Sequence, residues 1–232
     1  MRAPPAKRSF HDQLDLLQGR LMEMAGLAEE LVQRAVEAFL ERNAGALQGI
    51  REGDRVVDGI ELQVDQDVFE LIALHQPVAA DLRKILTTLK ICNDIERVGD
   101  HALNIAKAAR RLAQLPHLPE LPELAELAVL SQKMLRDALA AFASNDPKLA
   151  RDVCSRDDRV DDLKKNVRGI LIDLMTRDPG LIGPALEYLR VSQQLERIGD
   201  LSTNISEDVV FFVEGFSIKH NAERQAELSS SK

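Results

Sequence analysis

Apolar residues recur at intervals of three and four along most of this 232-residue chain. Leu14, Leu17, Leu21 and Met24 begin one such run, which continues to Ala38. This spacing places the apolar side chains on one face of a helix, as in a helical bundle or coiled coil. The composition agrees, because 45% of the residues are hydrophobic, only 3% are aromatic, and Leu and Ala, both good helix formers, dominate the apolar set.

Prolines mark the ends of the predicted helices, because a proline inside a helix costs about 3 kcal/mol. Ser9, with Asp12 three residues later, is expected to cap the first helix. Asp146 followed by Pro147 is expected to begin the fifth. The six long helices that we predict span residues 10–42, 45–75, 78–114, 123–145, 147–177 and 183–214.

One charged phrase occurs twice, one hundred residues apart. KICNDIERVGDHALNI (90–105) aligns without a gap with RVSQQLERIGDLSTNI (190–205), and DRVVD (54–58) resembles DDRVD (157–161). These pairs indicate an internal duplication of a three-helix unit. We therefore predict an all-α fold in which two tandem three-helix bundles form an elongated six-helix bundle. The units are residues 10–115 and 123–216, with a linker at 116–122 and a polar tail at 217–232.

The duplicated phrases place oxygen-bearing side chains on common helix faces. Residues four apart share a face, so Glu96, Asp100 and Asn104 form one stripe. Like charges at this spacing destabilise a helix by about 0.2–0.5 kcal/mol per pair, which a bound cation would offset. Carboxylate oxygens suit Mg²⁺, Mn²⁺, Ca²⁺ or iron. The candidate metal ligands are Asp54, Asp58, Glu96, Asp100 and Asn104 in the first half, and Asp157, Asp161, Glu196, Asp200 and Asn204 in the second.

The residues beside the stripes allow a second interpretation. Arg97 and Arg197 each follow the glutamate of a stripe and would neutralise the acids by ordinary salt bridges. Gly99 and Gly199 each lower helix stability by about 1 kcal/mol relative to alanine. Their presence therefore indicates that a neighbouring helix approaches closely at these positions.

The two halves are not equivalent in charge. Glu61 and Asp65 extend the acidic stripe of the second helix, whereas Lys164 and Arg168 hold the corresponding positions of the fifth. We therefore expect the first half to be the better metal site.

Several functional classes are disfavoured. The formal net charge of -8 argues against nucleic-acid binding, and two cysteines without a CxxC pair suit a reducing cytoplasm. We expect Cys92 to be a buried structural residue and the helix dipole to account for His75. We find no signal peptide, no run near the roughly 18 apolar residues of a membrane span, and no nucleotide-binding or hydrolase motif.

The sequence resembles the PhoU family, accessory regulators of bacterial phosphate uptake. The resemblance rests on DRVVD (54–58), QPVAADLRKI (76–85), NDIERVGDHALNIA (93–106), QQLERIGDLSTNISE (193–207) and the duplication, and it spans about residues 10–215. It implies multinuclear iron or zinc clusters bound through repeated E(D)xxxD motifs, on the acidic ligands named above. It also implies a cytoplasmic homodimer that represses phosphate-starvation genes and phosphate uptake. The implied partners are the ATPase of the phosphate ABC transporter and a sensor histidine kinase, so contact with the membrane would be through partners only.

Three functions remain open from the residues. A signalling adaptor that is not an enzyme is the leading hypothesis, because no catalytic constellation is present. A carboxylate-cluster metalloenzyme, such as a phosphohydrolase, would need paired metal ions with an open coordination position. A purely structural helical scaffold would need no metal at all.

Overall fold

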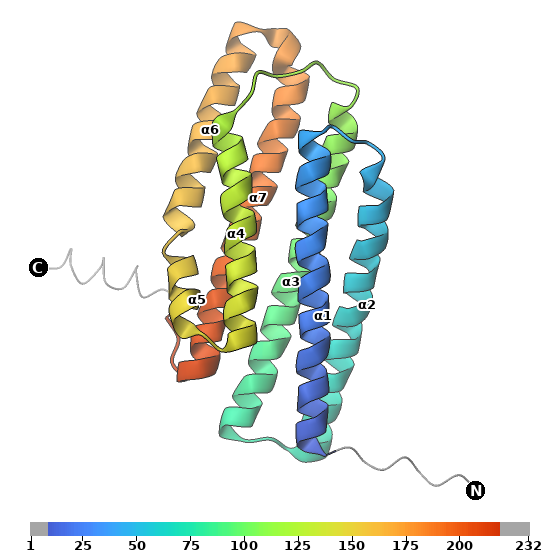
Figure 1. Ribbon diagram of the computed structural model, residues 1–232, viewed down its shortest axis with the longest axis vertical. Coiled ribbons are helices and arrows are strands. Elements are labelled where there is room, and N and C mark those ends of the chain that lie inside the picture. The colour runs from blue at the N-terminus through green and yellow to red at the C-terminus, as the bar shows by residue number, and fades with distance from the viewer. Residues whose placement is uncertain (1–8, 219–232) are drawn as a thin grey trace, which may run out of the picture.

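The computed structural model describes residues 9–218 and has the all-α architecture that the sequence predicts. Two helical bundles lie side by side and form an elongated molecule (Figure 1). The first comprises α1 (Phe10–Leu40), α2 (Ala46–His75) and α3 (Ala79–Leu112). The second comprises α4 (Pro122–Ser144), α5 (Pro147–Cys154), α6 (Asp157–Arg177), the short 3-10 turn η1 (Pro179–Leu181) and α7 (Ile182–Glu214). Most of the predicted polar tail lies outside the described residues.

The fifth helical segment differs from the prediction of one helix over residues 147–177. α5 ends at Cys154 and α6 begins at Asp157, so the segment is interrupted. Arg156 lies at the interruption and forms ion pairs with Asp137 of α4, at 2.5 Å, and with Asp152 of α5. These contacts hold the junction against α4. The sequence prediction missed the break because neither glycine nor proline marks it.

The predicted helix caps are present. Ser9 Oγ accepts a hydrogen bond from the Asp12 N–H at 3.2 Å, and Asp12 Oδ2 accepts one from the Ser9 N–H at 3.1 Å. Asp146 Oδ1 accepts the N–H groups of Lys148 and Leu149 at 2.9 and 3.2 Å. Caps of this kind stabilise a helix start by about 1 kcal/mol each, so they fix where α1 and α5 begin.

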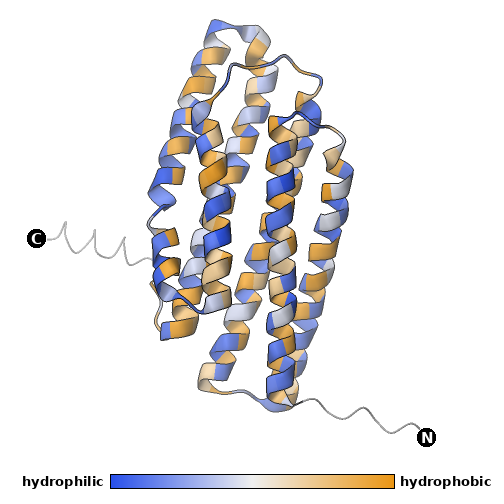
Figure 2. Cartoon of the chain, in the orientation of Figure 1, coloured by the Kyte–Doolittle hydropathy of each residue, from blue (hydrophilic) through white to orange (hydrophobic). Residues whose placement is uncertain are grey.

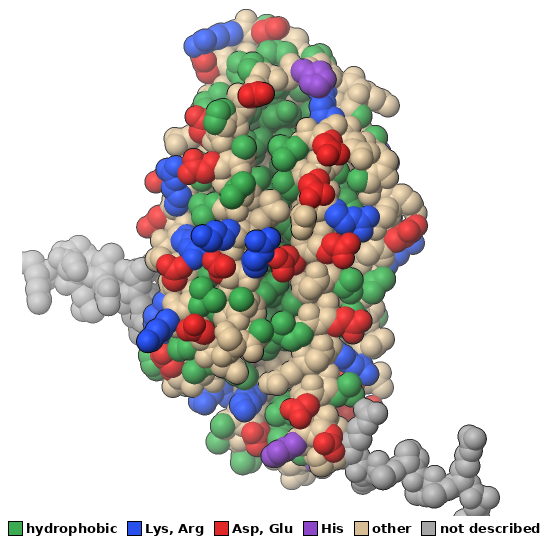
Figure 3. Space-filling model, in the orientation of Figure 1, with side chains coloured by type: hydrophobic (Ala, Val, Ile, Leu, Met, Phe, Trp, Pro, Cys, Tyr) green, Lys and Arg blue, Asp and Glu red, His purple; other side chains and the backbone are tan. Residues whose placement is uncertain are grey.

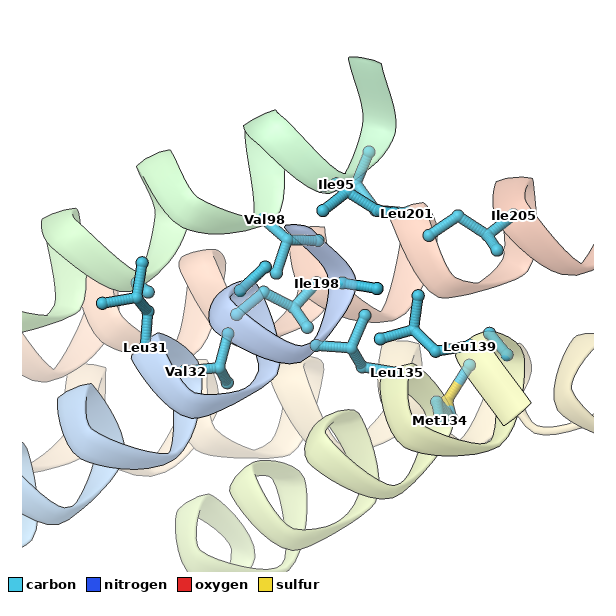
Figure 4. Close-up of a cluster of buried hydrophobic side chains, with 14 of the residues drawn as sticks. Leu31, Val32, Ile95, Val98, Met134, Leu135, Leu139, Ile198, Leu201 and Ile205 are labelled. Atoms are coloured by element: carbon cyan, nitrogen blue, oxygen red, sulfur yellow. The ribbon is translucent and has the colours of Figure 1, made fainter. Parts of the chain in front are cut away.

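One apolar core runs through both bundles. α3 packs along α7 as well as along α1, and α1 also contacts α4. Leu31 of α1, Val98 of α3, Leu135 of α4 and Ile198 of α7 belong to a single buried cluster (Figure 4). α1, α3, α4 and α7 thus form the centre of the molecule. α2 packs on α1 and α3, and α6 packs on α4 and α7, so α2 and α6 lie outside this centre. Hydrophobic and hydrophilic residues alternate along the helices accordingly (Figure 2).

The face formed by α1 and α4 carries mixed charges (Figure 3). Arg136 of α4 donates to Glu29 of α1 at 2.8 Å, which links the two bundles on this face. Among residues 9–218, no helix combines the length and the apolar character needed to cross a lipid bilayer. Charged side chains interrupt this face. The continuous hydrophobic surface of the helices is therefore the one buried in the core.

Candidate functional site

Five carboxylates gather where α2 packs against α3. Asp54 is buried, with 7% of its surface exposed, whereas Asp58 and Asp100 are exposed. Glu61 and Glu96 are half-buried. The group therefore has a buried base and an open rim. We call it the first carboxylate cluster: Asp54, Asp58, Glu61, Glu96 and Asp100.

Burial and then mutual repulsion raise the pKa values of three members of this cluster, Asp54, Glu61 and Glu96. Burial, followed by the charges of Asp58 and Asp100, raises the pKa of Asp54 to about 6. Burial and then Asp100, Glu61, Asp58 and Asp54 raise the pKa of Glu96 to about 7. Each carboxylate thus lies close enough to oppose ionisation of the others. The cluster is an electrostatically strained site that a cation would stabilise.

Gly99 allows the buried member of the cluster to approach α3. A Cβ atom at this position would lie 3.1 Å from Asp54 Oδ1 and 3.7 Å from Val57 Cγ1. Gly199 has the same relation to α6, where its Cβ would lie 3.1 Å from Val160 Cγ1. The predicted close approach of a neighbouring helix is therefore confirmed at both glycines.

The second half brings together the corresponding acids of α6 and α7. We call Asp157, Asp161, Glu196 and Asp200 the second carboxylate cluster. Burial and then Glu196 and Asp157 raise the pKa of Asp200 to about 6. Burial also raises the pKa of Asp157, against a hydrogen bond that Thr203 Oγ1 donates to it at 3.2 Å. The duplicated motifs are therefore gathered in both halves.

A lysine already occupies part of the second cluster. Lys164 Nζ forms an ion pair with Glu196 Oε1, and Arg197 lies 3.7 Å from both Glu196 Oε2 and Asp200 Oδ2. In the first half, Arg97 instead pairs with Asp94 at 3.4 Å, outside the cluster. Salt-bridge neutralisation, the alternative that the sequence left open, thus applies to the second cluster.

The two predicted asparagine ligands face the seam between α3 and α7. Asn104 donates to Gln194 Oε1 at 3.4 Å and accepts from Lys107 Nζ at 3.0 Å. Asn204 lines a hollow with Lys90, Asp94 and Arg97. The hydrogen bonds given by the structure therefore associate Asn104 with α7 and not with the α2 carboxylates.

The carboxylate oxygens of the first cluster fit a hard cation, although they do not form a complete coordination site. Within residues 9–218, no three His, Cys, Asp or Glu side chains are arranged around a single metal position. Binding would therefore require the rim carboxylates to reorient. Cys92 is buried with a pKa raised to about 12, chiefly by desolvation, and its Sγ contacts Met24 Sδ at 3.5 Å. Its burial confirms the structural role predicted for Cys92.

One buried oxygen of the second cluster accepts no hydrogen bond. Glu196 Oε2 is buried and accepts no hydrogen bond from any residue that the structure describes. Its cationic neighbour is Arg197, whose Nε lies 3.7 Å away. The second cluster is thus balanced by ion pairs, with Lys164 on one oxygen of Glu196 and Arg197 near the other.

Two groups of functional interest were not among the predicted ligands. Glu61 belongs to the first cluster because α2 presents it one turn beyond Asp58, a spacing that was visible in the sequence. Gln194 meets Asn104 and His101 across the α3–α7 seam. No sequence signal indicated that contact, because it depends on the register of two helices from different repeats.

Known proteins resemble this chain over most of its length. A profile described as the PhoU domain matches residues 21–109 and 124–209. A "phosphate-specific transport system accessory protein PhoU homolog" from Clostridium acetobutylicum is 33% identical over 216 residues, covering 93% of this chain and 99% of that protein. The homologue of the same name from Pseudomonas aeruginosa is 36% identical over 214 residues, covering 92% and 88%.

Solved structures agree with these matches. The crystal structure of PhoU from Pseudomonas aeruginosa matches with a TM-score of 0.87 at 34% identity. The match covers 90% of this chain and 100% of that structure. The "phosphate transport system regulatory protein PhoU" from Streptococcus pneumoniae has a TM-score of 0.84 at 27% identity, covering 91% and 100%. The duplicated bundles, the paired acidic motifs and these matches agree, and the chain belongs to the PhoU family.

Proposed function

We propose that this protein regulates phosphate uptake as an accessory protein of the phosphate-specific transport system. The observation that carries the proposal is its similarity, over almost the whole chain, to proteins named as accessory to that system. In this role it would contact the transporter ATPase and a sensor histidine kinase and would repress phosphate-starvation signalling when phosphate is plentiful. The protein would act in the cytoplasm, as a homodimer, and would reach the membrane only through these partners.

Genetic complementation tests this role. In a strain lacking the gene, a phosphate-starvation reporter should stay active at high phosphate, and the wild-type chain should restore repression. Affinity capture at high and low phosphate should recover the transporter ATPase and the kinase. Constitutive repression in the deletion strain, or unaltered reporter output after complementation, would contradict the proposal.

We further propose that the carboxylate clusters bind metal ions. Asp54, Asp58, Glu96 and Asp100 would hold the ion in the first half, with Glu61 as an additional ligand, and a bound cation would neutralise them and connect α2 to α3. Asp157, Asp161, Glu196 and Asp200 would do so in the second half. The raised pKa values of Asp54, Glu96 and Asp200 support this, because burial and then neighbouring acids disfavour each ionised carboxylate, and a bound cation would favour it.

The oxygen-only donor set favours particular metals. Iron, Mg²⁺ and Mn²⁺ accept carboxylate ligands, whereas protein zinc sites are built mainly from Cys and His. Metal analysis of protein purified without chelators should therefore find iron, Mg²⁺ or Mn²⁺. A Glu96→Ala, Asp100→Ala double variant should lose part of that metal. Unchanged metal content and partner affinity would exclude the metal role.

We propose that the protein acts by binding rather than by catalysis. Its relatives carry accessory and regulatory names, which supports this interpretation. A panel of phosphoesters with added Mn²⁺ tests it. Turnover that disappears in the Glu96→Ala, Asp100→Ala variant would instead support the phosphohydrolase alternative.

A further inference from the structure

A basic hollow lies in the seam between α3 and α7, and no member of either carboxylate cluster lines it. Its volume is about 480 Å³, and it is lined by Asn104, Lys107, Arg111, Arg190 and Gln194. Three of these side chains are cationic, two are carboxamides, and none is a carboxylate. We call this the basic seam hollow. It is unusual on a chain whose formal net charge is -8.

A buried glutamate fixes two of the cations. Glu187, which is 6% exposed, accepts from Arg111 Nη1 at 3.1 Å through Oε2 and pairs with Arg190 through Oε1. The Arg111 and Arg190 side chains remain 47% and 57% exposed. Each guanidinium group has five N–H donors, so most of them are available to a ligand. With Lys107 included, the group keeps two positive charges beyond the one that Glu187 neutralises.

The carboxamides are also held in place. Lys107 Nζ donates to Asn104 Oδ1 at 3.0 Å, and Asn104 Nδ2 donates to Gln194 Oε1 at 3.4 Å. His101 Nδ1 lies 2.8 Å from the same Gln194 oxygen, which can only accept, so the imidazole donates there. Because Oε1 receives both bonds, the Gln194 Nε2 group is left as a further donor beside the cations.

The duplication supplies an internal comparison. At the other end of the seam, a hollow of about 420 Å³ is lined by Lys90, Asn93, Asp94, Arg97, Asn204 and Asp208. Lys90, Asp94 and Asn204 are the duplicates of Arg190, Gln194 and Asn104. Glu207 and Phe211 replace Lys107 and Arg111, and Thr87 replaces Glu187. The packing of α3 on α7 thus creates a hollow at each end of the seam. Of these two, only the basic seam hollow has three cations beside a buried carboxylate.

We propose that the basic seam hollow binds a phosphate-type oxyanion. Guanidinium groups match the geometry of phosphate oxygens, and a lysine adds a third charge without a fixed direction. Glu187 acts as a positioning residue that keeps both guanidinium groups directed into the hollow. The ligand is either free inorganic phosphate or the phosphate group of a nucleotide, since both present the same oxygens. This binding goes beyond the proposed regulatory function and does not depend on it.

Calorimetry or NMR titration of the full chain with inorganic phosphate, ATP and chloride, at constant ionic strength, tests the site. Saturable binding of phosphate or ATP supports the proposal, and the stronger of the two identifies the source. Lys107→Gln should weaken that binding by about tenfold, because one charge-assisted hydrogen bond is lost while the Glu187 pairs remain. Lys90→Gln is the matched control at the other end of the seam and should bind like the wild type.

Two outcomes would overturn the proposal. One is equal affinity for chloride and phosphate, or no saturable binding of phosphate or ATP by the wild type. The other is equal binding by the wild type and the Lys107→Gln variant, as expected for phosphate held by metal at the carboxylate clusters. Both readouts are direct binding to the isolated protein, so their failure leaves the proposed regulatory role standing.

Discussion

The two carboxylate clusters share a motif but differ in how their charge is balanced. In the first, Glu61 adds a carboxylate beside Glu96, and the pKa of Glu96 rises to about 7 through burial and then neighbouring acids. In the second, Lys164 takes the place of Glu61 and forms an ion pair with Glu196. The same helix pairing thus gives one cluster dominated by carboxylates and one that contains ion pairs with Lys164 and Arg197. The position held by Glu61 in one half and Lys164 in the other contributes to this difference.

Exchanging that residue in the second half should have the largest effect. Lys164→Glu removes the partner of Glu196, which is 8% exposed, and places a like charge beside it. We expect the free energy of unfolding in chelator to fall by about 2–3 kcal/mol. Added Mn²⁺ should restore part of that loss, measured by urea denaturation.

Lys165→Glu is the control for that exchange. Lys165 is exposed and pairs with Asp162 at 3.5 Å and, at the solvent-exposed edge of the second cluster, with Asp161 at 4.0 Å. The same charge change one residue along should therefore cost less than about 1 kcal/mol. Equal losses in the two variants would show that net charge, and not the contact with Glu196, sets the stability of the second cluster.

The first cluster should make stability depend on pH. Burial and then neighbouring acids raise the pKa of Glu96 to about 7 in the folded protein, whereas the ordinary pKa of a glutamate is 4.5. Between these values the folded state binds more protons, so stability falls as the pH rises. Glu96→Gln removes this pH dependence, so between pH 4.5 and 7.5 the variant should gain about 1 kcal/mol of stability relative to the wild type in chelator.

Chelator-free titration with Mn²⁺ completes that test. The cation should raise the stability of the wild type at pH 7.5 more than that of Glu96→Gln, because it competes with the proton for the same carboxylates. A stability difference between the two proteins that is the same at both pH values would contradict the assignment of Glu96 to the cluster.

The reciprocal exchange introduces a lysine into the first carboxylate cluster. Glu61→Lys introduces an ammonium group where Lys164 stands in the other half. We expect the metal-free protein to gain about 0.5–1 kcal/mol and its affinity for Mn²⁺ to fall. Glu70→Lys, on α2 but outside the cluster, should leave Mn²⁺ affinity near that of the wild type. An unchanged affinity in Glu61→Lys would remove Glu61 from the site.

Removing one exposed rim charge should have the smallest effect. Asp58 raises the pKa values of Asp54, Glu61 and Glu96, in each case after burial. Asp58→Asn should therefore stabilise the metal-free protein by about 0.5 kcal/mol. Asp161→Asn is the corresponding change in the second half, where Lys165 lies 4.0 Å from the carboxylate, and it should bring no gain. Thermal unfolding in chelator compares the two.

Local signals in the sequence were enough for most of the fold. The apolar spacing from Leu14 to Ala38, the Ser9 and Asp146 caps and the prolines define the helices, and the repeated phrase defines the two units. The interruption at Arg156 was not predictable, because no glycine or proline marks it and Arg156 pairs there with Asp137 of a different helix. Local propensity carries no information about such a contact.

The candidate site was predictable in the same measure. Spacing by four residues placed Glu96 with Asp100 and Asp54 with Asp58, and comparison of the repeats singled out Lys164. The destination of Asn104 was not predictable, since its partner Gln194 belongs to the other repeat. Which face of a duplicated helix meets its own unit, and which meets the other, is decided by tertiary packing.

The core shared by the two repeats also determines how the protein should lose its structure. Ile95 and Val98 of α3 lie in the same buried cluster as Ile198 and Leu201 of α7 (Figure 4). Neither repeat can open without exposing part of the other, so the chain should behave as a single cooperative unit. Ligand binding then acts on the whole unit by mass action. An ion held on α2 and α3 would therefore protect α6 and α7 from unfolding, although it touches neither.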